Sequence, residues 1–232
     1  MRRRSYRGMA VEIVVLIAAL AITVSARAVE PGTSLFLVAK PEMPDPLFAQ
    51  SVILMLPRSE DLPLVAGLIV NKPIRKMPLN QLFPQDAALK NRSDTAYFGG
   101  PVDIEAPAIV YRADRAIDKS TRLAGDVYVS LDPDLATALA QDPKRVHDFR
   151  LVLGRSQWTP DQLHSEMMEG SWYTVTAEAN IVFSADPGGV WNTLAARARL
   201  IPAANPRMFR PPPRLFPVSN QGPWSAMYGY LR

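Results

Sequence analysis

The chain has 232 residues, 48% of them hydrophobic, which is enough to bury one substantial core, and its formal net charge is +4. The positive charge lies at the two ends: residues 29–198 hold 16 basic and 21 acidic side chains, and this net charge of −5 argues against nucleic acid as a partner of the central part. The chain contains no cysteine, which excludes disulfides, thiolate catalysis and Cys-containing metal sites.

The first 28 residues have the three parts of a secretory signal. Arginines crowd residues 2–7, an apolar run covers residues 13–24, and Ala26-Arg27-Ala28 is a small-residue cleavage site. The run is short for a membrane-spanning helix, which needs about 20 apolar residues. We expect a cleaved signal peptide and a periplasmic or secreted protein. The alternatives are an inner-membrane anchor that contacts the bilayer only through residues 9–24, and a cytosolic protein with a spurious start.

After the leader, short strands are separated by turns. Nearly continuous apolar runs favour strands that are covered on both faces. The strands are predicted over residues 35–39, 51–56, 65–70, 96–98, 108–111, 127–131, 149–153, 172–176 and 181–183. The turn signal Asn71-Lys72-Pro73 should end the third strand, with Pro73 preventing further pairing. The polar segment 114–126 is expected to be an exposed connection.

Four short helices and one helical turn alternate with the strands. Asp or Thr at the N-cap accepts a free amide hydrogen, and a proline at the first helical position has none to lose. This pattern predicts the turn at Asp45-Pro46 and helices beginning at Asp132-Pro133, Thr159-Pro160 and Asp186-Pro187, while apolar spacing predicts a helix over residues 79–83. Gln162 should complete a capping box with Thr159.

The stretch Tyr97-Phe98-Gly99-Gly100-Pro101-Val102 predicts a sharp exit from a strand. Glycine permits positive φ or a close backbone approach, and Pro101 restricts the residue before it, so Gly99 is the expected site of the unusual dihedral. Asn71, Gly99 and Gly100 are candidates to line an anion-binding pocket, or they form two ordinary strand-terminal turns. Asp45 is a candidate ligand contact, although its spacing favours helix capping.

Gln162 and Glu166 lie one helical turn apart, with Trp158 and Trp172 nearby in sequence. These four residues are candidates for a polar, aromatic-walled ligand site, with capping and a solvated helix face as the alternative explanations. The two histidines, His147 and His164, are expected to be exposed and without partners. The nucleophile and metalloprotease motifs Gly-x-Ser-x-Gly, Ser-x-x-Lys and His-Glu-x-x-His are absent. We therefore predict no catalytic residue, no metal and no cofactor.

Residues 199–232 form a tail of different composition. They contain seven prolines, which favour extended polyproline geometry over regular structure. They also contain five aromatic residues, which are unusual in a solvated linker: Phe209, Phe216, Trp224, Tyr228 and Tyr230. The tail is expected to wrap on the domain or to dock to a partner.

Several motifs between residues 32 and 198 resemble those of the YqgE/AlgH family, in the family's order. They are Phe36-Leu37-Val38-Ala39, Asp45-Pro46-x-Phe48, Gly67 to Pro73, Phe98 to Val102, Trp158-x-x-x-Gln162-Leu163, Gly170-x-Trp172 and Ile181-Val182-Phe183. The resemblance implies one α+β domain over residues 29–198, with a strongly bent, partly barrel-like mixed β-sheet and four or five short flanking helices. It implies no reaction, and the family's usual label is transcriptional regulator. The leader and the tail depart from the family pattern.

The sequence thus predicts a non-catalytic binding or regulatory module, exported or membrane-tethered, that recognises an unidentified protein partner or small ligand. The first alternative is the family label, a cytosolic DNA-associated transcriptional regulator, against which the acidic centre counts. The second is a hydrolase whose site follows no motif recognised above.

Overall fold

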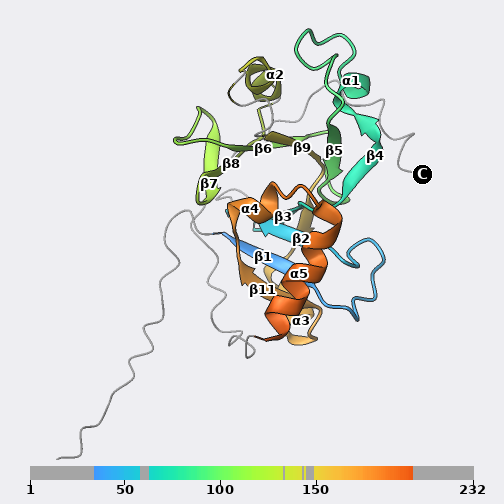
Figure 1. The fold of residues 1–232 in the computed structure, drawn as a ribbon. Helices are drawn as coiled ribbons and strands as arrows, with labels where there is room; N and C mark the ends of the chain where they lie inside the picture. The colour runs from blue at the N-terminus through green and yellow to red at the C-terminus, as the bar shows by residue number, and fades with distance from the viewer. Residues whose placement is uncertain (1–33, 58–62, 133, 143, 145–148, 201–232) are drawn as a thin grey trace, which may run out of the picture.

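The computed structural model describes residues 34–57, 63–132, 134–142, 144 and 149–200 (Figure 1). The predicted leader, most of the tail and His147 lie outside these residues. The described chain forms a single α+β domain with two sheets and five helices. The predicted class is therefore confirmed, and the β-structure is divided between two sheets that are not closed into a barrel. Within the described ranges, no helix is long and apolar enough to cross a bilayer.

The first sheet has five strands, all antiparallel, in the order β10-β3-β2-β1-β11. They are β1 (Leu35–Ala39), β2 (Val52–Met55), β3 (Val65–Ile69), β10 (Ser156–Trp158) and β11 (Trp172–Thr176). The second sheet has six strands in the order β4-β5-β9-β6-β8-β7, with β5 and β9 parallel. They are β4 (Pro73–Pro78), β5 (Thr95–Phe98), β6 (Ala108–Arg112), β7 (Ser120–Ala124), β8 (Val127–Ser130) and β9 (Phe149–Leu153).

The helices are short and pack against the faces of the sheets (Figure 1). They are α1 (Leu79–Leu82), α2 (Asp134–Gln141), α3 (Pro160–Met168), α4 (Ala179–Val182) and α5 (Pro187–Arg199). The longest, α5, lies along the five-stranded sheet, where the Trp191 indole donates a hydrogen bond to the Ala39 carbonyl (2.7 Å). The predicted N-cap is confirmed there, because the Asp186 carboxylate accepts from the Gly189 amide (3.1 Å).

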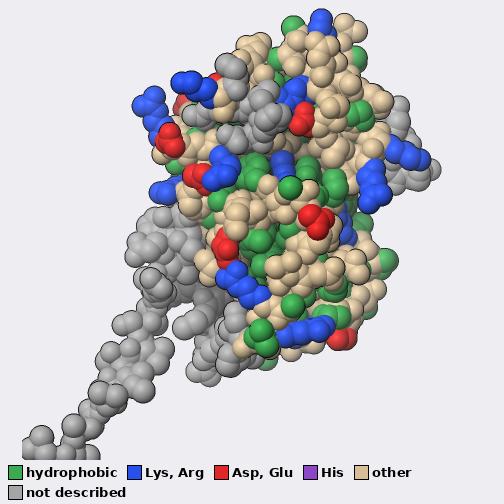
Figure 2. Space-filling view, viewed as in Figure 1, with side chains coloured by type: hydrophobic (Ala, Val, Ile, Leu, Met, Phe, Trp, Pro, Cys, Tyr) green, Lys and Arg blue, Asp and Glu red, His purple; other side chains and the backbone are tan. Residues whose placement is uncertain are grey.

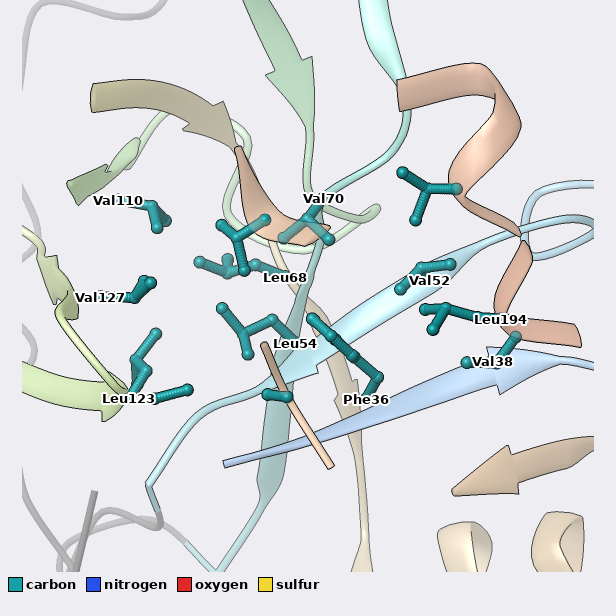
Figure 3. Packing of buried hydrophobic residues seen from close by; sticks show 14 of the residues in the cluster. Phe36, Val38, Val52, Leu54, Leu68, Val70, Val110, Leu123, Val127 and Leu194 are labelled. Carbon is teal, nitrogen blue, oxygen red and sulfur yellow. The ribbon is translucent and has the colours of Figure 1, made fainter. Parts of the chain in front are cut away.

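The main core lies between the two sheets and beneath α4 and α5 (Figure 3). Alternate residues of β1 point to opposite sides: Phe36 and Val38 enter this core, whereas Leu37 and Ala39 enter a second apolar cluster on the far face of the sheet. The six-stranded sheet also has a second covered face, packed against α1 and α2. Both faces of each sheet are therefore buried, which explains why the strands read as continuous apolar runs.

Three local predictions are wrong, each for a physical reason. Pro73 does not prevent pairing, because β4 is an edge strand and a proline at its first position need not donate to a ladder. The segment 114–126 contains β7, a polar edge strand that has little apolar signal. Residues 181–183 belong to or follow helix α4 and form no strand. A short apolar run does not distinguish a buried helical turn from a strand.

Candidate functional site

Four of the predicted site residues meet in one cluster around the carboxylate of Glu166. Its Oε2 atom accepts hydrogen bonds from both indole nitrogens, that of Trp158 at 3.0 Å and that of Trp172 at 2.9 Å. Its Oε1 atom accepts from the Gln162 side-chain amide at 3.2 Å. Phe48 completes the group, with its ring centroid 6.0 Å from that of Trp158 and 5.9 Å from that of Trp172. We call these five residues the aromatic–carboxylate cluster.

The local sequence explains how α3 delivers Glu166 to the indoles. Thr159 caps the helix by accepting from the Gln162 amide (3.1 Å), and Pro160 occupies the first turn, as predicted. The Gln162 side chain extends forward to Glu166, and its amide donates there. Residues four apart share a helix face, so Gln162 and Glu166 are aligned over the same neighbours.

The distance between the two tryptophans of the cluster also shows how strongly the five-stranded sheet is curved. Trp158 lies in β10 and Trp172 in β11, which are the two outer strands of that sheet. In a flat sheet the outer two of five strands lie about 19 Å apart, at about 4.8 Å per neighbour. The indole centroids are nevertheless 6.1 Å apart in an edge-to-face arrangement. The sheet must therefore bend strongly, with α3 connecting its two edges.

The hydrogen-bonding groups of the cluster are paired with one another. The two tryptophans are 2% and 4% exposed, so an unpaired indole N–H would be costly there. One oxygen of the Glu166 carboxylate accepts hydrogen bonds from both indole N–H groups, and the other oxygen accepts from the Gln162 side chain. Edge-to-face aromatic contacts add stabilisation beyond burial.

Asp45 and Asn71 organise the turn that carries Phe48. The Asp45 carboxylate accepts from the Leu47 amide (2.8 Å), which agrees with the capping interpretation. The Asn71 side chain is buried, accepts from the Val52 amide (2.8 Å) and donates to the Gln50 carbonyl (2.9 Å). Asn71 thus holds the end of the turn against the end of β3, and its polar atoms are engaged with the backbone.

Lys72 reaches the same turn, and the sequence interpretation missed it. Its Nζ atom donates to the Leu47 carbonyl (2.6 Å). Burial lowers the pKa of the Lys72 ammonium, and nearby Asp45 offsets this in part. Lys72 directly follows Asn71 in a turn that the sequence predicts only as the end of a strand. Nothing in that sequence pattern indicates that the Lys72 side chain is partly buried.

Gly99 and Gly100 allow two stretches of backbone to cross. The Gly99 carbonyl accepts from the Ile69 amide (3.0 Å) and the Ser156 hydroxyl (3.2 Å), which joins β5 to the five-stranded sheet. A Cβ atom on Gly99 would overlap the Gly154 carbonyl oxygen, and one on Gly100 would overlap Arg155. The unusual dihedral is at Gly100, with φ +147°, so its assignment to Gly99 is wrong. Glycine before proline adopts a mirror-image extended geometry without the strain of a side chain.

The structure thus brings four predicted site residues together in one cluster: Trp158, Gln162, Glu166 and Trp172. Asp45 and Asn71 are linked to this cluster through the 45–50 turn. Gly99 and Gly100 lie elsewhere, at the crossing of the two backbone stretches. His164 is exposed on α3. No group of three or more His, Cys, Asp or Glu side chains in the described part is placed to hold a metal ion. The sequence interpretation also missed Arg150, whose signal was a single cation in the apolar strand 149–153.

Comparisons with known proteins agree with the fold. The model of the AlgH-like family matches residues 36–203. A UPF0301 protein of Methylococcus capsulatus is 32% identical over 169 residues, which cover 71% of this chain and 90% of the relative. The UPF0301 protein YqgE of Escherichia fergusonii is 27% identical, with 69% and 88% covered. The solution structure of AlgH from Pseudomonas aeruginosa aligns with a TM-score of 0.58 and 26% identity, over 73% of this chain and 89% of that one.

Proposed function

This chain belongs to the AlgH-like family, and we propose that it is an exported or membrane-tethered binding module that recruits a protein partner without catalysing a reaction. The observation on which the proposal rests is that the polar groups of the aromatic–carboxylate cluster form hydrogen bonds with one another. Glu166 accepts three hydrogen bonds from neighbouring side chains. A carboxylate engaged in this way suits a rigid platform better than proton transfer to a substrate.

The contact surface in this proposal is the turn over residues 45–50. Phe48 packs on both indoles, while the adjacent Leu47 keeps 37% of its surface exposed. The turn is held by hydrogen bonds from Asn71 and Lys72, so the exposed side chain is presented on a rigid base. Rigid apolar anchors bind partners at a low entropic cost.

Two features of the sequence support the remaining parts of the proposal. The basic, apolar and small-residue segments of residues 1–28 support export or tethering. The tail over residues 199–232 combines five arginines with five aromatic residues, a composition typical of interface anchors. The tail would therefore add to the contact made by the turn.

The experiment compares partner capture by the full chain and by a chain lacking residues 200–232, using cross-linking in the native cells. We expect the truncated chain to keep its midpoint of thermal unfolding and to lose the captured partner. Leu47→Ser should lose the same partner, whereas Leu131→Ser, a matched change at a leucine that is 36% exposed directly after β8, should retain it.

Two results would contradict the proposal. A large fall in thermal stability on truncation would show that the tail completes the core. Equal capture by Leu47→Ser and the unmodified chain would remove the turn from the interface. Salt-dependent DNA binding that persists after removal of both basic ends would instead favour a transcriptional regulator.

A further inference from the structure

Arg150 is a charged residue placed between the two sheets. It lies in β9 beside four apolar residues, and its neighbour two positions along, Val152, belongs to the main core. Its guanidinium donates to the Val70 carbonyl (3.1 Å) and to the Ser184 carbonyl (2.7 Å). The Cζ atom lies 4.3 Å from the centroid of the Tyr97 ring and 5.6 Å from that of Phe183.

The charge of Arg150 has no described counterion. Four other arginines of the domain form ion pairs with Asp or Glu: Arg92, Arg112, Arg155 and Arg197. Among the described residues, no carboxylate lies within 4.0 Å of the Arg150 guanidinium. Carbonyl oxygens supply only partial charges, whereas buried cations in proteins are normally paired.

The surroundings of Arg150 are aromatic. Burial lowers the pKa of the guanidinium and raises the pKa of the Tyr97 phenol, and the Asp94 carboxylate lies near enough to Tyr97 to help raise the pKa of its phenol. The nearest acid along the chain from Ser184 is Asp186, whose carboxylate caps α5. Figure 2 shows hydrophobic side chains with both basic and acidic ones on the surface where the six-stranded sheet meets α4 and α5.

We propose that Arg150 anchors a binding site for a small molecule that carries a carboxylate or phosphate group next to an apolar body. A guanidinium has five N–H donors in a planar fork that matches such oxyanions, and within the described part of the chain Arg150 donates to two acceptors, the Val70 and Ser184 carbonyls. The half-buried Phe183 ring provides an apolar wall for the rest of the molecule, while the buried Tyr97 ring holds the guanidinium in place. The site is separate from the 45–50 turn, so this inference goes beyond the proposed function and does not depend on it.

The test uses the full-length chain and three probes, namely benzoate, phenyl phosphate and inorganic phosphate, with sodium chloride at equal ionic strength as the salt control. The readouts are the NMR signal of the Arg150 Nε–H group and the midpoint of thermal unfolding. We expect at least one probe to shift both in a saturable way. Arg150→Met should weaken that binding about tenfold or more, because charge-assisted hydrogen bonds are lost.

Arg112→Met is the matched control, since it removes an arginine from the adjacent strand β6 that pairs with Asp126. It should leave the affinity unchanged. Arg150→Met should still fold, because replacing a half-buried charge that has no carboxylate partner among the described residues by an apolar side chain is often neutral or stabilising. If Arg150→Met does not fold, the proposal is judged by whether a probe shifts the NMR signal of the Arg150 Nε–H group in the unmodified chain.

The probes also identify the oxyanion. Binding of benzoate alone indicates a carboxylate ligand, and binding of the phosphate probes alone indicates a phosphate ligand. The proposal is overturned if no probe saturates the unmodified chain, or if Arg150→Met binds as tightly as it does. Neither readout involves the protein partner, so failure here is distinct from failure of the proposed function.

Discussion

Glu166 holds two buried indole rings through a single carboxylate oxygen. The Glu166→Leu variant should lower the free energy of unfolding by about 2–4 kcal/mol, because both indole N–H groups would remain buried without an acceptor. Glu166→Gln retains a side-chain oxygen and should lose less. Urea unfolding followed by tryptophan fluorescence measures both changes.

The control for this prediction lies on the same helix. Glu169 is exposed near the end of α3, and Glu169→Leu should change the free energy of unfolding by less than about 0.5 kcal/mol. If Glu166→Leu is as mild as Glu169→Leu, the carboxylate is not what holds the indoles.

Gly100 allows a second test at the scale of one residue. Its φ of +147° and the overlap of any Cβ with Arg155 both oppose a side chain. Gly100→Ala should therefore cost about 3 kcal/mol or more. Gly125→Ala is the matched change, because Gly125 also has a positive φ but has open space around it. It should cost about 1 kcal/mol, and equal losses by thermal unfolding would contradict the steric argument.

Asp86 connects two elements, the segment before β5 and helix α2. Its carboxylate accepts from the Thr137 hydroxyl (2.6 Å) and from the amides of Ala88 (2.8 Å) and Leu89 (2.9 Å). These hydrogen bonds, led by that of Thr137, lower the pKa of Asp86 from its ordinary value of 3.8. The group therefore stabilises the folded state above that pH, and this contribution disappears as the pH falls through the lowered pKa.

Measurements of unfolding across acid pH test this prediction. The difference in unfolding free energy between the unmodified chain and Asp86→Asn should shrink below the ordinary pKa of 3.8. Thr137→Val, which removes the main donor, should show less of this pH dependence. A difference that stays constant from neutral to acid pH would show that Asp86 titrates alike in the folded and unfolded chains.

At the scale of the whole molecule, the net positive charge lies outside residues 29–198. If the leader is a cleaved signal, N-terminal sequencing of the protein from the periplasmic fraction of its native cells should start at Val29, after the site Ala26-Arg27-Ala28. The Ala28→Leu variant should accumulate as a longer precursor, because a small residue is required at that position. A protein that starts at Met1 in the cytosolic fraction would contradict export.

The sequence by itself determined most elements, because their signals are local. Proline and a capping side chain mark the starts of α3 and α5, and apolar runs mark the inner strands. It also indicated Trp158, Gln162, Glu166 and Trp172 as one group, since helix periodicity aligns two of them and the others flank the helix. The sequence did not predict the edge strands β4, β7 and β10, because an edge needs neither an apolar run nor a complete set of amide donors.

Only the tertiary structure decided what these residues contact. Sequence spacing does not show that the outer strands β10 and β11 bend until Trp158 and Trp172 touch, nor that Glu166 lies between their nitrogens. It also does not show that Arg150 lies against the rings of Tyr97 and Phe183, which are 53 and 33 positions away in the chain. Burial, charge compensation and backbone crossing depend on residues distant in sequence, so they are properties of the packed domain.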